Sequence, residues 1–372
     1  MRAVVLVGGQ GTRLRPLTFT TPKPLLPIAN QVLLDRQLGW LAAHGVDEVA
    51  LSLGYLPDAF VARFPGERYV DSAGRTVRLV YAVEPYPLGT AGAIRFAAEQ
   101  LGVGERFVVC NGDVLTGLDL GALVDFHDEH GAEATIALAR VDDPSRFGVV
   151  PTFADGEVKA FVEKPPRDAA PTDWINAGTY VLEPAALDRV PPGLKVSIER
   201  DTFPRMLQDR RHLFAMRSAD YWIDIGTPQQ YLQVHTDVLA GRLGLPPAPA
   251  ARETAPGIWV QGAGDGTERL GAPALVGAGV DIGPDTRVAG SVLGAGVHIA
   301  EGATVTGSVV HDGARVGPQV RVVRSIVGAG AVIGAKATIR DESIVGADTV
   351  LEPGSELVDT RVPEAKAVPA PS

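Results

Sequence analysis

Short runs of apolar, mostly β-branched residues alternate with longer amphipathic stretches from residue 1 to about residue 240. The segment LLDRQLGWLAAHG predicts a helix that ends at Gly45. This alternation is typical of a sheet layered with helices. The predicted strands are RAVVLVGG (2–9), DEVALSLG (47–54), RLVYAVE (78–84), RFVVCNGDV (106–114) and EATIALARV (133–141). Because such sheets bind ligands at the carboxyl ends of their strands, the glycines after the first strand and Asn-Gly-Asp after the fourth are candidate site segments.

An internal repeat replaces this pattern near the end of the chain. The segments VGAGVD, LGAGVH, VHDGAR, VGAGAV and VGADTV begin at Val276, Leu293, Val310, Val327 and Val345, at spacings of 17, 17, 17 and 18 residues. Within each unit an aliphatic residue recurs about every six positions, which would stack short strands into a solenoid. The repeats resemble the hexapeptide repeats of left-handed parallel β-helices.

These patterns predict the domain organisation. We expect a first domain over 1–240, a linker rich in Pro and Ala over 241–256, a left-handed β-helix over 257–360 and a disordered tail over 361–372.

Composition and charge narrow the classes of function. The chain is 45% hydrophobic and 21% charged, as in soluble globular proteins, and its net charge is -10. This charge disfavours nucleic acid or an anionic membrane as a partner, although a local cluster of cations can still bind a phosphorylated substrate. The single cysteine, Cys110, excludes an intrachain disulfide and is expected in a buried strand. Apolar stretches are shorter than the roughly 20 residues of a membrane span, and we expect a cytoplasmic protein.

The segment VGGQGTRLRPLTFTTPKPLLP (7–27) has the chemistry of a phosphate-binding loop. Glycines let backbone amides approach phosphate oxygens, an arginine can donate two hydrogen bonds at once, and Pro22 and Pro24 fix the backbone around Lys23. A Walker A loop is excluded because no Gly-Lys pair follows, and a dinucleotide fingerprint is excluded because Leu14 replaces its third glycine.

The same segment resembles the signature loop of the nucleoside-diphosphate-sugar pyrophosphorylases, or sugar-1-phosphate nucleotidyltransferases. Further motifs follow in the family's order: EPYPLGTAGAI, NGDVL, RFGVVP, FVEKP, NAGTYVLEP and YWIDIGTPQQYL. The resemblance covers nearly all of residues 1–235. It implies an α/β fold, with a Rossmann-like nucleotidyltransferase domain built on a mixed sheet before the β-helix. It also implies a reaction that joins a nucleoside triphosphate to a sugar 1-phosphate and releases pyrophosphate.

The resemblance implies a role for each motif. The catalytic candidates are Arg13 on the departing pyrophosphate, Lys23 near the α-phosphate, and Asp113. Asp113 and Asp224 would bind Mg²⁺ between them, since carboxylates suit this hard cation. The nucleotide-binding candidates are Gly8, Gly9, Gly11, Thr12, Arg13, Glu84, Gly89 and Thr90. The sugar-phosphate-binding candidates are Gly148, Glu163, Lys164, Asn176 and Gly178.

Position 84 favours guanine. Relatives that use uracil or thymine often carry Gln here, whereas the carboxylate of Glu84 can accept from both N1–H and the 2-amino group of guanine. Together with SIERDTFPRML and the β-helix, the pattern is most similar to the mannose-1-phosphate guanylyltransferases. The resemblance leaves open another triphosphate, or a glucose, heptose or cyclitol phosphate.

Two alternatives belong to other classes of function. One is a non-catalytic regulatory subunit, which would be expected to lose parts of the loop or the metal carboxylates. The other is a bifunctional enzyme whose β-helix transfers an acyl group with His298 or His311. We expect both histidines instead to face solvent on a structural domain. The exposed edges of open solenoid coils further predict a homo-oligomer, formed through the β-helix, the first domain or both.

Overall fold

The computed structural model describes residues 1–209, 212–244 and 246–364. The chain forms two compact units. The first unit comprises residues 1–9 and 34–224, and the second comprises residues 10–33 and those from 225 onward.

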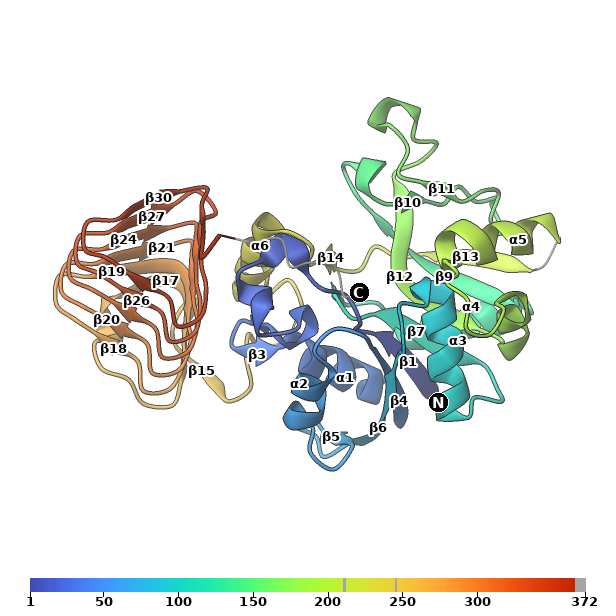
Figure 1. Cartoon of the computed structure of the whole chain (residues 1–372), viewed down its shortest axis with the longest axis horizontal. Coiled ribbons are helices and arrows are strands. Elements are labelled where there is room, and N and C mark those ends of the chain that lie inside the picture. Colours follow the sequence, from blue (N-terminus) through green and yellow to red (C-terminus); the bar gives the residue numbers. More distant parts are fainter. Residues whose placement is uncertain (210–211, 245, 365–372) are drawn as a thin grey trace. The chain divides into compact units, whose positions relative to one another are not determined.

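A ten-stranded mixed sheet forms the centre of the first unit (Figure 1). Its path runs β11-β10-β12-β7-β1-β4-β6-β5, and β9 joins β12 to β13. Strand β1 pairs in parallel with β4 and β7, whereas β12 runs antiparallel to β7 and β9. The bounds are β1 (Arg2–Leu6), β4 (Glu48–Leu53), β5 (Arg68–Val70), β6 (Thr76–Val83), β7 (Phe107–Asn111), β9 (Ala134–Arg140), β10 (Gly148–Val149), β11 (Val162–Glu163), β12 (Trp174–Leu182) and β13 (Leu213–Arg217). The predicted α/β fold with a mixed sheet is confirmed.

Helices and a second, two-stranded sheet complete this unit. The helices are α1 (Leu33–Ala43), α2 (Pro57–Arg63), α3 (Gly89–Leu101), α4 (Leu120–Glu129) and α5 (Phe203–Gln208). Strands β8 (Val114–Thr116) and β14 (Trp222–Asp224) pair antiparallel. Side chains of α3 and α5, among them Ile94 and Phe203, share one buried core with Val4 of β1 and Val109 of β7. That packing holds the sheet and these helices together by removing apolar surface from water.

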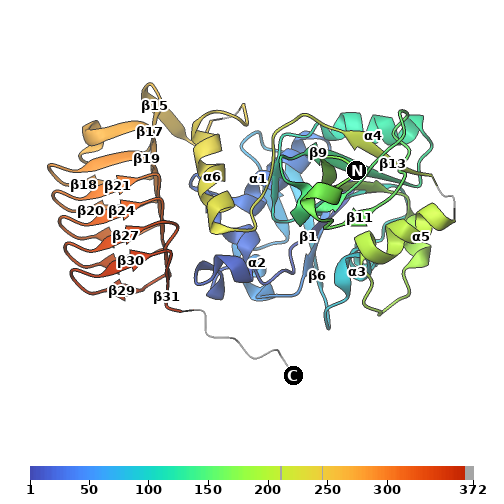
Figure 2. The same cartoon turned by 90° about the horizontal axis from the view of Figure 1, so that it is seen from above.

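The second unit contains the left-handed β-helix that the repeats predicted. Figure 2 shows its coils stacked in parallel. Its strands are β15 (Ala251–Ala255), β16 (Ile258–Gln261), β17 (Leu270–Val276), β18 (Asp281–Ile282), β19 (Arg287–Leu293), β20 (His298–Ile299), β21 (Thr304–Thr306), β22 (Val309–Val310), β23 (Arg315–Val316), β24 (Arg321–Val323), β25 (Ile326–Val327), β26 (Val332–Ile333), β27 (Thr338–Arg340), β28 (Ile344–Val345), β29 (Val350–Leu351), β30 (Glu356–Val358) and β31 (Arg361–Val362).

Stacking of equivalent residues explains the repeat length. Val276, Leu293, Val310, Val327 and Val345 are fully buried in one column. A polar ladder runs beside it, in which the amide of Ser308 donates to Ser291 Oγ and that of Ser325 to Ser308 Oγ, each at 3.1 Å. The single 18-residue spacing comes from one extra residue at Asp341–Glu342, where φ is 55° and 66°.

The ends of the β-helix differ in detail from the sequence expectation. Strand β15 lies inside the segment 241–256 that was predicted to be a linker, and it pairs antiparallel with β16. The composition of this segment could not reveal the strand, because β15 forms by pairing with the free edge of β16, and that pairing depends on tertiary structure. In the predicted tail, residues 361–362 form β31, and residues 365–372 lie outside the described residues.

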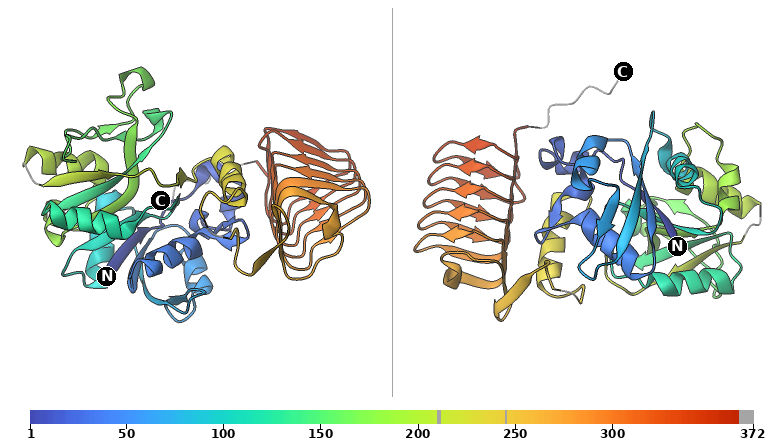
Figure 3. Two further views of the ribbon diagram at one scale, coloured as in Figure 1. Left: turned by 180° about the vertical axis from the view of Figure 1, so that it is seen from behind. Right: turned by 90° about the horizontal axis from the view of Figure 1, so that it is seen from below.

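The early segment 10–33 belongs to the second unit, together with α6 (Pro228–Leu239). It ends in a hairpin of β2 (Pro27–Ile28) and β3 (Gln31–Val32). Helix α6 begins after Thr227, whose hydroxyl accepts a hydrogen bond from the Gln230 amide, and it packs beside the β-helix strands β17 and β19 (Figure 3). Among the described residues, every helix is too short or too polar to cross a membrane.

Candidate functional site

The glycine-rich segment folds back on itself within the second unit. Short 3-10 turns form over Thr12–Leu14, Leu17–Phe19 and Lys23–Leu25. Gly11 has φ 59°, and a Cβ added there would lie 3.0 Å from Thr18 Cγ2 and 3.2 Å from Lys23 Cβ. The Thr18 hydroxyl donates to the Gly11 carbonyl at 2.8 Å. This close approach, which requires glycine at position 11, brings the beginning of the loop to Lys23.

The two predicted cations of this loop have different surroundings. The side chain of Lys23 is buried, with 9% of the residue exposed, whereas Arg13 and Thr12 are exposed. The effective dielectric constant is lower inside a protein than in water, so a buried ammonium attracts a nearby anion more strongly than an exposed one does. An exposed guanidinium remains able to donate to a large anion that arrives from solvent.

In the first unit, Gly8 follows β1 and Glu84 follows β6, the two strands that flank β4. A Cβ on Gly8 would lie 3.1 Å from the Gly54 amide nitrogen and 3.4 Å from Glu84 Oε1. The Ser52 hydroxyl donates to Glu84 Oε1 at 3.1 Å, and the Leu88 amide donates to Glu84 Oε2 at 2.9 Å. A Cβ on Gly9 would meet no atom within 4 Å among the described residues. Glu84 is thus held in one orientation beside a glycine backbone that has open space next to it.

Gly89 and Thr90 meet the segment that precedes α5. Gly89 has φ 70°, and a Cβ there would lie 2.6 Å from the Val196 carbonyl oxygen. The Thr90 hydroxyl donates to Glu199 Oε2 and accepts from the Ile198 amide, both at 2.8 Å. These bonds occupy the hydroxyl with protein partners, so Thr90 could contact a nucleotide more readily through its backbone.

The pairing of β8 with β14 places Asp113 and Asp224 at the same end of a two-stranded sheet. Asp224 is opposite Val114, and Asp113 directly precedes Val114 in the turn after β7. Two carboxylates so placed fit the donor set of a hard divalent cation. In the described part of the chain, groups of three or more His, Cys, Asp or Glu that could hold a metal do not occur. A cation bound here would therefore need further oxygen ligands from phosphate or water.

The sugar-phosphate candidates of β10 and β11 form one cluster. Gly148 pairs with Glu163 across the two strands, and a Cβ at Gly148 would lie 3.2 Å from Glu163 Oε2. Lys164 Nζ lies 2.6 Å from Glu163 Oε1, and Arg200 Nη2 lies 3.7 Å from the same oxygen. Two cations thus converge on one carboxylate, an arrangement that can accept both a phosphate and sugar hydroxyls.

Asn176 and Gly178 shape the neighbouring part of β12. Asn176 Oδ1 accepts from the Gly178 amide at 2.9 Å, and Asn176 Nδ2 donates to the Tyr180 hydroxyl at 2.8 Å. Gly178 has φ 72°, and a Cβ there would lie 2.5 Å from Asn111 Nδ2. The irregularity within β12 at Asn176–Gly178 therefore needs glycine, and it brings β12 against Asn111 at the end of β7, two residues before Asp113.

Several residues at the site were not singled out from the sequence. Trp222 Nε1 donates to the Ala177 carbonyl at 2.9 Å, and the Trp222 ring meets Phe147 edge to face at 5.5 Å. Arg200 and Ser52 also contact the predicted site residues. Trp222 could have been found from the sequence because it lies two residues before the predicted metal ligand Asp224. Arg200 could have been found because it lies in the motif SIERDTFPRML. The sequence did not indicate Ser52 as a site residue, because a serine within an apolar strand can occur for many structural reasons.

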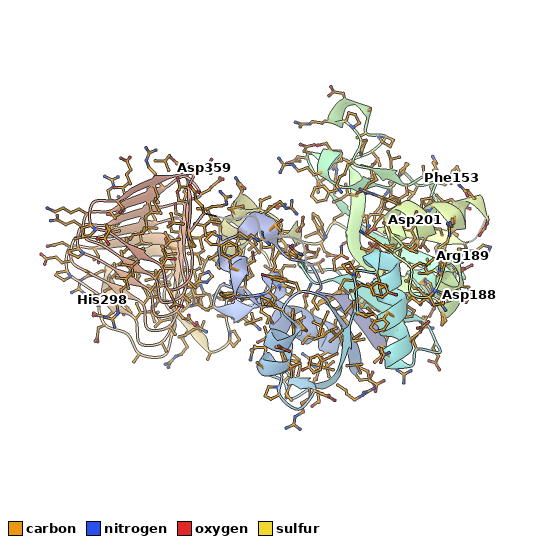
Figure 4. All side chains as sticks on the ribbon, in the orientation of Figure 1. Phe153, Asp188, Arg189, Asp201, His298 and Asp359 are labelled. Atoms are coloured by element: carbon orange, nitrogen blue, oxygen red, sulfur yellow. The ribbon has the colours of Figure 1, made fainter. Side chains whose placement is uncertain are left out.

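The residues outside the site are partly as expected. Cys110 is buried in β7, and burial raises the pKa of its thiol to about 12, so it stays protonated. His298 is partly exposed on the coil stack (Figure 4), where Nδ1 lies 2.8 Å from Asp281 Oδ2. The expectation that His311 faces solvent is wrong, since 8% of this residue is exposed. Its ring packs beside Tyr231 of α6, a contact that the coil pattern alone could not reveal.

Comparisons with known proteins agree with this arrangement. The family described as "Nucleotidyl transferase" matches residues 2–241, and the family described as "EIF2B subunit epsilon LbH domain" matches residues 265–357. A mannose-1-phosphate guanylyltransferase of Mycobacterium tuberculosis is 43% identical over 251 residues, which are 67% of each chain. A probable mannose-1-phosphate guanylyltransferase 2 of Arabidopsis thaliana is 38% identical over 75% of this chain and 76% of its own.

Two solved structures are similar to part of the chain. The crystal structure of HddC from Yersinia pseudotuberculosis has a TM-score of 0.54 and 30% identity, and covers 63% of this chain and 97% of its own. The same protein complexed with GMP-PN has a TM-score of 0.53 and 31% identity, with the same coverage. From the matched family, the relatives and the fold, the chain belongs to the nucleotidyl transferase family.

Proposed function

We propose that this chain transfers the guanylyl group of GTP to mannose 1-phosphate, releasing pyrophosphate and forming GDP-mannose. The observation that carries the proposal is the geometry of the glycine-rich loop. Gly11, two residues before Arg13, packs closely against the buried Lys23. The relatives named mannose-1-phosphate guanylyltransferase and the HddC complex with GMP-PN support this pair of substrates.

In the proposed reaction, a phosphate oxygen of the sugar phosphate attacks the α-phosphorus of GTP. The bond from this phosphorus to the oxygen bridging to the β-phosphate breaks, and pyrophosphate leaves. Both reactants are anionic, so catalysis depends on placement and on positive charge. Arg13 and the amides of Gly8, Gly9 and Gly11 would bind the triphosphate, and Lys23 would stabilise charge on the α-phosphate.

Glu84 would select guanine. Its oxygens each accept one protein hydrogen bond, from Ser52 and from Leu88. Because each carboxylate oxygen offers two lone pairs, both can accept a second bond, from N1–H and the 2-amino group of guanine. Uracil and thymine present carbonyl oxygens beside their N–H, which a carboxylate disfavours.

Nucleotidyl transferases of this family generally use a divalent metal. We infer that the metal here is Mg²⁺ and that Asp113 and Asp224 would hold it. A bound Mg²⁺ supplies positive charge to phosphate oxygens and helps to orient them. The carboxylates themselves would fix where that charge lies.

The sugar phosphate would be bound by the cluster around β10–β12. Lys164 would pair with its phosphate, Glu163 would accept from sugar hydroxyls, and the glycines at 148 and 178 would leave room for the ring. Trp222, which fixes the Ala177 carbonyl, would keep the segment Asn176–Gly178 in place. Sugar isomers differ in hydroxyl orientation, so these contacts would set sugar selectivity.

Pyrophosphate release with Mg²⁺ tests the proposal, with GTP, ATP, UTP and dTTP each paired with mannose 1-phosphate and with glucose 1-phosphate. We expect turnover with GTP and mannose 1-phosphate. Turnover confined to another pair would overturn the choice of substrates and keep the reaction class. Absence of release with every pair, from protein that still binds GTP, would favour a regulatory subunit.

We further propose that the chain forms a homo-oligomer in the cytoplasm. The first and last coils of a β-helix present strand edges, and contacts between copies would cover them. Light scattering over a range of concentrations tests the assembly, and a mass equal to 39.0 kDa throughout would contradict it.

A further inference from the structure

Two buried side chains that the proposed reaction does not use are joined to the Lys23 loop. In the second unit, the Tyr231 hydroxyl of α6 donates to the Pro27 carbonyl oxygen at 2.6 Å. The same hydroxyl lies 3.0 Å from His311 Nε2, in the coil that follows β22. Because the single hydroxyl proton goes to Pro27, the chain of hydrogen bonds is complete when His311 carries its proton on Nε2 and donates to Tyr231.

His311 departs from the rule of its own repeat. The residue that follows the buried column of aliphatic residues is Gly277, Gly294, Gly328 and Gly346 in the other coils. A Cβ would lie 2.5 Å from the Ala295 amide nitrogen at Gly277 and 2.6 Å from the Ala347 amide nitrogen at Gly328, so the stacking of coils favours glycine. A histidine at this position of one coil is unusual, and it reaches out of the β-helix to Tyr231.

Further hydrogen bonds tie the same hairpin to its surroundings in the second unit. Asn30 Nδ2 donates to the Leu293 carbonyl at 2.8 Å and to Gln261 Oε1 at 3.2 Å. The Ala29 amide donates to His235 Nδ1 at 3.2 Å. Ala29 and Asn30 have φ of 46° and 58°, a left-handed conformation that is unfavourable for residues other than glycine. The surrounding contacts offset that cost and hold the hairpin in a single form.

The hairpin is in turn continuous with the segment that carries Lys23. The Leu26 amide donates to the Lys23 carbonyl at 3.1 Å, and the Leu33 amide donates to the Leu26 carbonyl at 3.1 Å. Pro27 follows directly, so a shift of its carbonyl moves the base of the turn Lys23–Leu25. On the other side of Lys23, Gly11 and Thr18 leave little free space.

From these contacts we infer that Tyr231 and His311 are positioning residues for the reaction: they fix Pro27, and through it Lys23, so the β-helix sets the placement of the phosphate-binding loop. The inference rests on the proposed role of Lys23. It assigns to the β-helix a part in catalysis that needs no active site in the solenoid itself.

The test compares Tyr231→Phe with Tyr81→Phe in the full-length chain. Both changes remove one hydroxyl that donates to a backbone carbonyl, since Tyr81 donates to Phe64 at 2.8 Å in the first unit. We expect Tyr231→Phe to lower kcat with GTP and mannose 1-phosphate about tenfold, with an unchanged KM for the sugar phosphate, and Tyr81→Phe to lower neither. His311→Asn should lower kcat similarly, and the double variant should lose little more because both act through one chain.

Hydrogen exchange of the peptide covering residues 22–33 provides a readout that does not depend on turnover. It should exchange faster in Tyr231→Phe and His311→Asn, and at the wild-type rate in Tyr81→Phe. Wild-type exchange in both test variants would overturn the inference, as would faster exchange with unchanged kinetics. A wild-type protein that is inactive with every substrate pair would refute the proposed function, whereas faster exchange in its variants would still support the connection from the β-helix to the loop.

Discussion

The Leu88 amide donates a hydrogen bond of 2.9 Å to Glu84 Oε2, which closes a turn over PYPL and orients the carboxylate. A glutamine at position 84 could still accept this bond with its amide oxygen. It could no longer offer two acceptors to the edge of guanine.

We therefore expect Glu84→Gln to lower kcat/KM for GTP by about 10- to 100-fold, the loss expected for a charge-assisted hydrogen bond, while UTP and dTTP are not disfavoured further. Initial rates with each nucleotide measure this selectivity. Glu253→Gln is a matched control, because Glu253 Oε1 also accepts from the amide four residues later, at 2.8 Å. An equal decline for all four nucleotides would show that Glu84 supports the turn and does not select the base.

Lys23→Met should lower kcat by about 10²- to 10³-fold, the effect typical of removing one group that stabilises transition-state charge. Because Lys23 is buried, an apolar replacement of similar length should leave the thermal midpoint close to that of the wild type. Single-turnover kinetics with GTP would separate this effect from GTP binding. Lys159→Met is the control, since Lys159 is exposed and lies 4.5 Å above the ring of Phe153. A kcat within threefold of wild type would remove Lys23 from the catalytic group.

The carboxylates at the end of the β8–β14 sheet should act as a unit. Asp113→Asn and Asp224→Asn should each lower kcat by about 10²-fold or more, and the double variant should lose little beyond the worse single variant. Titration calorimetry of Mg²⁺ into protein with GTP should show weakened metal affinity in each variant. Asp155→Asn is the control, because Asp155 is exposed and its Oδ1 accepts a local hydrogen bond from the Glu157 amide at 3.1 Å. Additive losses with unchanged Mg²⁺ affinity would argue against a shared metal.

The sequence pattern predicted those parts of the fold that depend on residues close together in the chain. The 17-residue spacing follows from stacking one coil on the next, and the apolar runs became β1, β4, β6, β7 and β9. Gly8 and Gly9 after β1, and Asp113 after β7, lie where strands end, as the sequence indicated. Their roles in binding and catalysis stay predictions until they are measured.

Contacts between distant segments could not be predicted in this way. Tyr231 and Pro27 are 204 residues apart in the chain, and Thr90 meets Glu199 across 109 residues. The histidine at position 311 looked like a surface residue, because the coil pattern describes which side chains face the solenoid core and says nothing of what covers the outside. Helix α6 packs against the β-helix, and its Tyr231 contacts His311, which is buried.

Burial of His311 should make the fold sensitive to acid. Burial lowers the pKa of this ring from 6.5 to about 4, and the nearby Asp312 carboxylate opposes the change. Between these pH values the unfolded chain binds a proton at His311 that the folded chain does not. The free energy of unfolding should therefore fall by up to about 3 kcal/mol as the pH drops from 6.5 to 4, and this contribution should level off below pH 4. Urea unfolding at pH 7 and pH 4.5 measures the difference, which should shrink in His311→Asn and persist in His298→Asn, since 44% of the His298 side chain is exposed. If His311→Asn lost as much stability on acidification as the wild type, the acid sensitivity would have to come from other groups, such as the buried His127, whose pKa burial also lowers.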